Sequence, residues 1–167
     1  VHGFYAQALK RSDKVFFQNP DDLKLFQDMH LLDASKPTVV VNGSGVNVQD
    51  FDVLPLPQND VGTVKASFLL IARLLGDKGV REYAESARII KAQYPESEFH
   101  LVGWIDDNPS AISKAELDTW IADGRLKYWG KLSDVRPAIA ECSVYVLPSY
   151  REGTPRTVLE AMAMGRA

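Results

Sequence analysis

Residues 67–102 read SFLLIARLLGDKGVREYAESARIIKAQYPESEFHLV, and this stretch decides the fold class. The run Ser67–Ala72 is short and almost entirely apolar, as expected of a strand that is buried on both faces of a sheet. From Lys78 to Tyr94, apolar side chains recur on one face of a helix, and Glu98–Val102 has the pattern of a second strand. A buried strand, a helix and another strand in this order predict a parallel β-α-β unit.

The same alternation continues towards the carboxyl terminus. The predicted elements are helix Lys114–Ala122, strand Leu126–Trp129, helix Val135–Glu141, strand Ser143–Leu147 and helix Pro155–Met164. Four successive strand-then-helix units predict an α/β fold with a doubly wound, Rossmann-like parallel sheet.

The segment before residue 67 is less regular. It contains a predicted strand at 14–18, a helix at 21–29 and a β-branched strand at 38–41, followed by a linker or surface loop at 50–64 with two prolines and a glycine. The first residues resemble the end of a helix, and the last helix would normally lead into another strand. We therefore expect a fragment that carries one nearly whole α/β domain and a small part of another.

Composition excludes several classes of protein. The 167 residues correspond to about one domain of ~150 residues, and 46% apolar with 25% charged residues is typical of a soluble globular chain. The net charge of −3 gives no reason to expect nucleic acid as a partner. Cys142 is the only cysteine, which excludes an intrachain disulfide and favours a reducing compartment. No apolar run approaches the ~18 residues of a membrane span, and the amino end lacks the pattern of a signal peptide, so we expect a cytoplasmic domain.

The residues after each predicted strand are candidates for ligand binding, because ligands of open parallel sheets bind at the carboxyl ends of the strands. Thr154 is predicted as the N-cap and Pro155 as the first residue of the last helix, whose first N–H groups would form an anion site. Two cations, Arg73 and Lys78, could hold a diphosphate opposite that helix without a metal ion.

Two acidic side chains, Glu152 and Glu160, could accept hydrogen bonds from two rings of one extended ligand. On spacing alone, acids near a helix start are more often explained by the helix dipole. The pair Asp50 and Asp52 imitates an acidic metal motif but falls in a loop. We expect His100 and Cys142 to be core residues. The same is expected of Trp104, Trp120 and Trp129, with the alternative that Trp104, in a loop that follows a strand, lines a pocket.

The run VLPSYREGTPRTVLEAMAMG at residues 146–165 strongly resembles the signature of retaining glycosyltransferases of the GT-B fold, family 4. Segments 72–79 (ARLLGDKG), 42–47 (NGSGVN, with Phe51) and 128–134 (YWGKLSD) are similar to other segments of that family, in the same order. The resemblance covers about residues 38–167. It implies that 38–167 is a nucleotide-sugar-binding domain, truncated at its carboxyl end, and that 1–37 is the end of the acceptor domain.

The resemblance also implies roles for single residues. Arg73 and Lys78 would bind the diphosphate and assist its departure, Glu160 would hold the ribose, and Glu152 would hold the transferred sugar, with Arg73, Lys78 and Glu152 as the catalytic set. The remaining contacts to base, phosphate and sugar would come from Lys131, Leu132, Gly153, Thr154, Thr157 and Val158.

The family generally transfers a hexosyl group from a nucleotide sugar, here expected to be a UDP-sugar, to a glycan or lipid-linked acceptor without a metal or other cofactor. This implies a role in polysaccharide or cell-envelope glycan synthesis and possible peripheral association of the full-length enzyme with the cytoplasmic face of a membrane. Asn47 departs from the family, which often has Asp there, and none of the three histidines fits the acceptor domain's catalytic His, so the fragment is expected to bind a nucleotide without turnover. Alternatives are an epimerase or phosphorylase on the same fold, or a non-enzymatic receiver-like regulatory domain with Asp106 and Asp107 in its acidic cluster.

Overall fold

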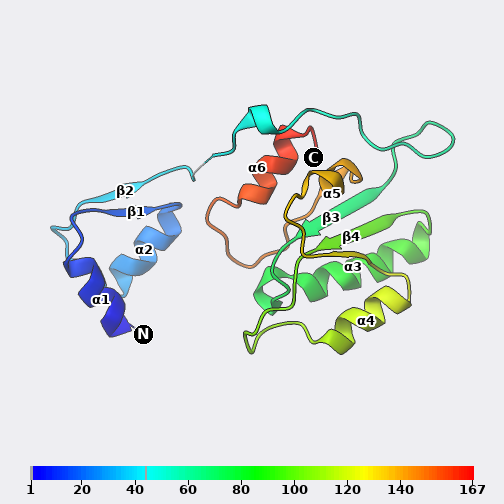
Figure 1. Cartoon of the computed structure of the whole chain (residues 1–167). Helices are drawn as coiled ribbons and strands as arrows, with labels where there is room; N and C mark the ends of the chain where they lie inside the picture. The colour runs from blue at the N-terminus through cyan, green and yellow to red at the C-terminus, as the bar shows by residue number, and fades with distance from the viewer. Residues whose placement is uncertain (1, 44) are drawn as a thin grey trace. The chain divides into compact units, whose positions relative to one another are not determined.

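The computed structural model describes residues 2–43 and 45–167. Val1, at the amino end considered above, and Ser44, in the segment 42–47, lie outside the described residues. The chain forms two compact units (Figure 1). The first contains the residues up to Gly45 together with Gly153–Arg156, and the second contains Val46–Glu152 together with Thr157–Ala167.

The first unit is small. Its elements are α1 (His2–Lys10), β1 (Val15–Phe17), α2 (Pro20–Asp28) and β2 (Thr38–Val40). The two strands pair in parallel, and the ring of Phe26 packs edge-on against those of Tyr5 and Phe17. Because β2 pairs with β1, residues 38–40 belong to this unit, whereas the sequence analysis counts them with the following domain. The division of the longer protein into domains stays a prediction.

The second unit is built on a four-stranded sheet of β3 (Ser67–Ile71), β4 (Glu98–Val102), β5 (Lys127–Gly130) and β6 (Val144–Tyr145). All its pairings are parallel, and the strand order is β5-β4-β3-β6. The central pair runs in register from Ser67 opposite Glu98 to Ile71 opposite Val102. The other elements are η1 (Val48–Asp50), η2 (Gly76–Lys78), α3 (Val80–Gln93), α4 (Lys114–Ala122), α5 (Arg136–Ala140) and α6 (Arg156–Ala163).

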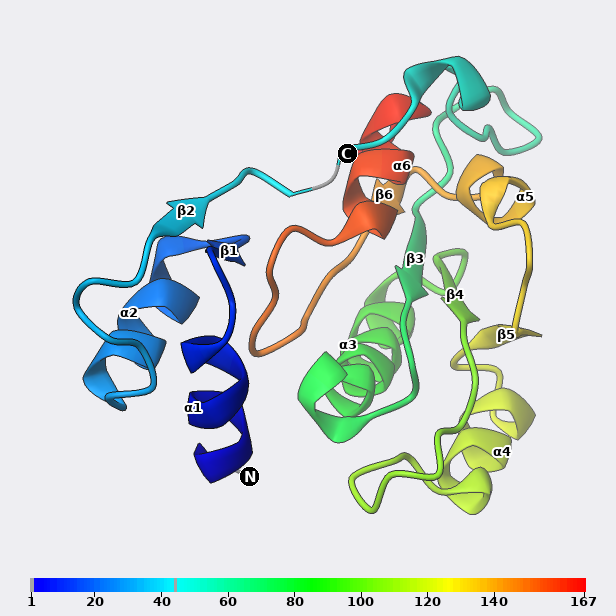
Figure 2. The same cartoon turned by 60° about the vertical axis from the view of Figure 1, so that its left-hand side comes forward.

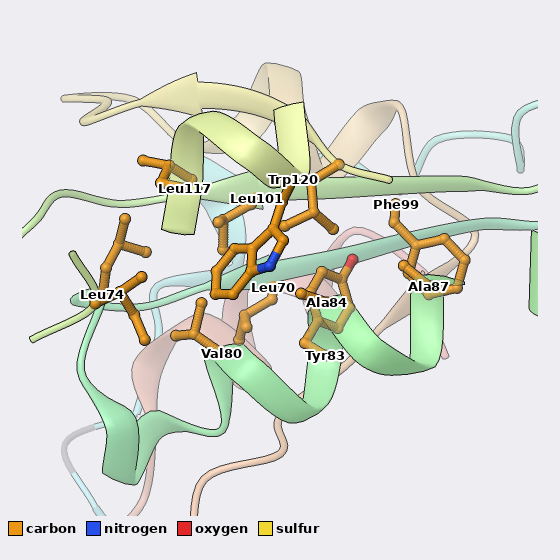
Figure 3. Packing of buried hydrophobic residues seen from close by; sticks show 12 residues of the cluster. Leu70, Leu74, Val80, Tyr83, Ala84, Ala87, Phe99, Leu101, Leu117 and Trp120 are labelled. Carbon is orange, nitrogen blue, oxygen red and sulfur yellow. The ribbon is translucent and has the colours of Figure 1, made fainter. Parts of the chain in front are cut away.

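Helices cover both faces of this sheet, which explains why β3 and β4 are apolar throughout. Helices α3 and α4 lie on one side of the strands, and α5 and α6 lie on the other (Figure 1 and Figure 2). Because side chains alternate along each strand, Leu70 and Leu101 pack in the layer of α3 and α4, whereas Leu69 and Val102 pack in the layer of α5 and α6. Figure 3 shows the layer that α3 and α4 form with the sheet, in which Trp120 of α4 packs against Leu70 and Leu101. The predicted doubly wound, Rossmann-like α/β fold is confirmed.

The connections leave one point in the sheet where the winding reverses. From β3 the chain moves outward through α3 to β4 and through α4 to β5, and it then crosses back to place β6 on the other side of β3. Ligands of open α/β sheets bind outside the carboxyl ends of the strands at such a switch point. The topology therefore predicts a ligand-binding site at the loops after β3 and β6.

Several element ends differ from the predicted ones. The helix predicted from Lys78 begins at Val80, because residues 76–78 form a 3-10 turn and Gly79 adopts a left-handed conformation that an α-helix cannot continue. The last helix begins at Arg156, one residue later than predicted, so Pro155 precedes the helix and Thr154 is not its N-cap by these bounds. The last strand spans only Val144–Tyr145, because its pairing with β3 is limited to these residues.

Candidate functional site

Two loops meet at the carboxyl ends of β3 and β6, the switch point of the sheet. The Nζ of Lys78, in the loop after β3, lies 2.7 Å from Oε1 of Glu152, in the loop after β6. Both side chains are largely but not fully buried, with 20% and 24% exposed. Two residues that sequence reasoning assigned to the diphosphate and to the sugar are therefore direct partners.

A glycine permits this approach. Gly79, with φ +69°, lies so close to the loop after β6 that a Cβ on it would stand 2.3 Å from the carbonyl oxygen of Pro148. Any side chain at position 79 would push that backbone away. The two segments are joined by a backbone bond as well as by the ion pair, since the N–H of Tyr150 donates to the carbonyl of Asp77 at 3.0 Å.

The buried hydroxyl of Tyr145 links the end of β3 to the start of α6. It donates to the carbonyl of Ile71, at the end of β3, and contacts Oγ1 of Thr157, in the first turn of α6, at 2.6 Å. Burial raises the pKa of the Tyr145 hydroxyl to about 12, and the charges of Glu152 and Glu160 add to this increase. Both carboxylates therefore act on one buried phenol, which remains a neutral hydrogen-bond donor at neutral pH.

Arg73 follows β3 by two residues, and its side chain is 49% exposed. Its Nη1 donates to Oδ2 of Asp106, in the loop after β4, at 3.2 Å. The contact links residues 33 positions apart, so it cannot be predicted from the sequence, where Asp106 belongs only to the receiver-like alternative.

Two further predicted residues follow β5. The Nζ of Lys131 lies over the ring of Trp104, 4.7 Å from its centroid, as a cation–π pair. Leu132 instead packs against the core layer beneath α5 and α6, so a contact with the base stays a prediction. Trp104 is in a loop and 39% exposed, so the expectation that it is a core residue is wrong. Its role in lining a pocket stays a prediction.

The first turn of α6 consists of Arg156, Thr157 and Val158, the residues whose N–H groups are predicted to bind an anion. Gly153 and Thr154 group with the first unit, where the backbone N–H of Thr154 donates to Oε1 of Gln18 at 3.5 Å. The donor-binding role of each of these residues stays a prediction.

His100 and Cys142 are buried, as the sequence predicts. Trp129 donates its indole N–H to Nδ1 of His100, and Nε2 of His100 contacts Glu98. Within residues 2–43 and 45–167, no helix has the length and apolarity to cross a bilayer, and no three metal-ligand side chains, those of Asp50 and Asp52 included, gather as a metal site.

Comparison with known proteins agrees with this architecture. The model of the family described as glycosyl transferases group 1 matches residues 65–167. An N,N'-diacetylbacillosaminyl-diphospho-undecaprenol alpha-1,3-N-acetylgalactosaminyltransferase from Campylobacter jejuni is 31% identical over the whole chain, which covers 44% of that relative. The amylovoran biosynthesis glycosyltransferase AmsK from Erwinia amylovora is 34% identical over 58% of this chain and 25% of its own length. The chain thus spans less than half the length of these relatives.

Solved structures share the fold at low sequence identity. TarM superposes with a TM-score of 0.73 at 15% identity and covers 98% of this chain and 30% of its own. The pneumococcal O-GlcNAc transferase GtfA, solved with UDP and GlcNAc, has a TM-score of 0.67 at 17% identity and covers 97% of this chain and 30% of its own. The fold is that of GT-B glycosyltransferases.

Proposed function

Because this chain belongs to the glycosyl transferases group 1 family, we propose that it supplies the donor-binding part of a retaining hexosyltransferase. The observation that carries the proposal is the Lys78–Glu152 ion pair at the switch point, since it joins a cation and a carboxylate where this fold binds ligands. The proposed donor is a UDP-sugar, which is supported by the presence of UDP in the related GtfA structure.

The acceptor is a glycan or a lipid-linked saccharide, in polysaccharide or cell-envelope glycan synthesis. The names of the two curated relatives support this class. One relative is named as an N-acetylgalactosaminyltransferase of N,N'-diacetylbacillosaminyl-diphospho-undecaprenol, and the other as a glycosyltransferase of amylovoran biosynthesis. For an acceptor of this kind, the full-length enzyme would work in the cytoplasm, at the cytoplasmic face of a membrane.

The diphosphate is the part of the donor whose charge grows during the reaction. The bond between the anomeric carbon and a diphosphate oxygen breaks, and the bonding pair leaves with UDP. The acceptor hydroxyl forms the new bond on the same face of the sugar, which retains the configuration, and its proton passes to the departing diphosphate oxygen. Arg73 and Lys78 would stabilise the leaving diphosphate together with the first-turn N–H groups of α6. These positive groups would do this without a metal ion or other cofactor.

The two carboxylates would accept hydrogen bonds from hydroxyl groups on either side of the diphosphate. Glu160 would bind the ribose, and Glu152 would bind the transferred sugar while it remains next to Lys78. Lys131 and Leu132 would lie at the base, and Gly153, Thr154, Thr157 and Val158 would contribute contacts to sugar and phosphate. The acceptor part of the longer protein is needed for turnover, so we expect the 167 residues alone to bind a nucleotide without transferring the sugar.

The test is a titration of the protein with UDP, GDP, UDP-N-acetylglucosamine and UDP-N-acetylgalactosamine, in EDTA and again with Mg²⁺. We expect binding of uridine nucleotides that does not change between the two conditions. Binding that requires Mg²⁺, or none at all, would contradict the proposal. Retention is tested in the full-length enzyme by the anomeric configuration of the product, measured by NMR.

A further inference from the structure

One loop, residues 103–112 between β4 and α4, contacts two of the three cations predicted to bind the donor. Asp106 accepts a hydrogen bond from Arg73 at 3.2 Å, and the ring of Trp104 lies beneath Lys131, 4.7 Å from Nζ. Neither Trp104 nor Asp106 is among the residues predicted to bind the donor.

The loop is fixed to the segment that carries Arg73. The N–H of Leu74 donates to the carbonyl of Trp104, the N–H of Gly76 to that of Ser110, and the N–H of Ile112 to that of Leu74, at 2.8–2.9 Å. Leu74 and Ile112 are fully buried in the core layer under α3 and α4. These bonds follow Arg73 in the chain, and before it the N–H of Ala72 donates to the carbonyl of Val102, at the end of β4, at 3.0 Å. The backbone around Arg73 is therefore tied both to β4 and to the loop that follows it.

The carboxylate of Asp106 is oriented within the loop. Its Oδ1 accepts the backbone N–H of Asn108 at 3.0 Å, which leaves Oδ2 directed at Nη1 of Arg73. An arginine side chain has many rotamers, and an acceptor held in one place selects among them. Because a guanidinium has five N–H donors, a bond through one nitrogen is compatible with the binding of a diphosphate by others.

Trp104 acts on Lys131 in a comparable way. The carbonyl of Gly130 accepts the N–H of Gly103 at 2.9 Å, so the residues before Lys131 and before Trp104 are joined by a backbone bond. The exposed ring then offers its face to the ammonium group.

We propose that Asp106 and Trp104 are positioning residues of the donor site, with Asp106 orienting Arg73 towards the diphosphate and Trp104 holding Lys131 beside the base. This inference rests on the proposed function. It predicts that each positioning residue acts through its own cation and not through the other.

The test is a double-mutant cycle in the full-length enzyme. The D106N substitution removes the charge but keeps an oxygen that can accept the Asn108 N–H. We expect D106N to lower kcat about tenfold with less than about a threefold change in the donor KM, and to change kcat by less than about twofold when Arg73 is already alanine. If R73A leaves too little turnover, the same cycle is measured as UDP affinity.

Three controls sharpen the cycle. The exposed neighbour Asp107 provides D107N, which should leave kcat and UDP affinity unchanged. The W104L substitution should lose its effect when combined with K131A, whereas D106N and K131A should be additive within about twofold. If D106N does not fold, as judged by circular dichroism, D106S takes its place, because serine also lacks the charge and its hydroxyl can accept the Asn108 N–H.

The outcomes separate the two proposals. If R73A itself changes neither UDP affinity nor kcat, the proposed role of Arg73 in donor binding is wrong. If R73A has a strong effect but D106N has none, or has the same effect with and without Arg73, only the positioning role of Asp106 is wrong. The inference is supported if the effects of D106N and R73A on kcat are not additive, whereas those of D106N and K131A are.

Discussion

The two edges of the four-stranded sheet use the same residue types in different ways. At the amino edge, Glu98 is in contact with Lys65 at 2.7 Å, Lys127 at 2.6 Å and His100 at 3.1 Å. At the carboxyl edge, the ion pairs Arg73–Asp106 and Lys78–Glu152 lie on loops. One edge surrounds a single carboxylate with three nitrogen partners, and the other distributes its charges over loops that a ligand can reach.

The protonation of Glu98 reflects this difference. Burial by itself raises the pKa of the Glu98 carboxyl, but the hydrogen bonds from Lys127, Lys65 and His100 outweigh burial and lower the pKa to about 2. A cavity of about 580 Å³ also opens at the amino edge, and it is lined by Lys65, Glu98 and residues of the segments 58–66 and 93–98. Because none of the predicted donor-binding residues lines this cavity, its size does not make it the candidate site. The carboxylate of Glu98 has three partners, so we interpret the amino edge as structural. The charges of the carboxyl edge lie on loops, so we interpret that edge as the one that binds a ligand.

The largest expected effect is at the carboxyl edge. The R73A substitution should lower kcat of the full-length enzyme about 10²–10³-fold, the scale of losing one positioned donor to a developing charge, and should raise the donor KM much less. The free energy of unfolding should change by less than about 1 kcal/mol, because the ion pair is half exposed. The matched control is R88A, which removes an exposed arginine paired with Glu85 on α3. A higher donor KM with normal kcat would restrict Arg73 to ground-state binding.

The opposite pattern is expected at the amino edge. The E98Q substitution should lower the free energy of unfolding by about 2–3 kcal/mol at pH 7, because Lys65 and Lys127 lose their shared carboxylate. The measurement is urea denaturation, with E96Q at an exposed neighbouring position as the control. UDP affinity of the folded protein should not change. A stable E98Q protein with impaired UDP binding would reverse the contrast between the two edges.

A smaller effect is expected from Glu160, on α6. The E160A substitution should weaken UDP binding by about 1–3 kcal/mol through the loss of charge-assisted hydrogen bonds to the ribose. Isothermal titration measures this change. M162A, at a position 63% exposed on the same helix, is the control. Equal affinities of the wild type and E160A would remove Glu160 from the ribose role.

The smallest effect is a dependence of stability on pH that comes from the amino edge. Burial lowers the pKa of His100 below its ordinary value of 6.5, and the pKa of Glu98 is lowered from 4.5 to about 2. In both cases the unfolded chain binds more protons than the folded chain, so the free energy of unfolding decreases as the pH falls. For His100 this loss begins below about pH 6.5, and for Glu98 it occurs between about pH 4.5 and pH 2. We expect the free energy of unfolding to decrease by about 1–2 kcal/mol between pH 7 and pH 4, with a shallower slope below pH 4.5 in E98Q. A stability that is constant over this range would contradict this interpretation.

The sequence predicted the sheet and most of its helices because their signals are local. Apolar runs such as Ser67–Ile71 and the apolar stripe of α3 depend only on neighbouring residues. The predicted start of α3 is too early because Gly79 ends the 3-10 turn 76–78 in a left-handed conformation. The closeness of Gly79 to Pro148, which leaves no room for a Cβ, could not be read from the sequence because Pro148 is distant in the chain.

The candidate site was predictable in part for the same reason. Arg73, Lys78, Glu152 and Glu160 could be found because they follow strands or lie in the last helix. Their partners depend on which strands become neighbours in space, and the contact of Arg73 with Asp106 could not be derived from a spacing of 33 residues. Of the three partners of Glu98, His100 lies two residues away on the same face of β4. Lys65 and Lys127, next to β3 and on β5, follow only from the strand order β5-β4-β3.

The glycine at position 79 limits how the donor specificity of this protein could be engineered. Since a Cβ there would stand 2.3 Å from the carbonyl oxygen of Pro148, replacement by alanine would force the two loops apart and lengthen the distance between Lys78 and Glu152. If donor specificity were changed by exchanging loops with a relative, residues 76–79 and 148–152 would have to be exchanged together. Either segment transferred alone would pack against a segment from the other protein, to which its backbone does not fit.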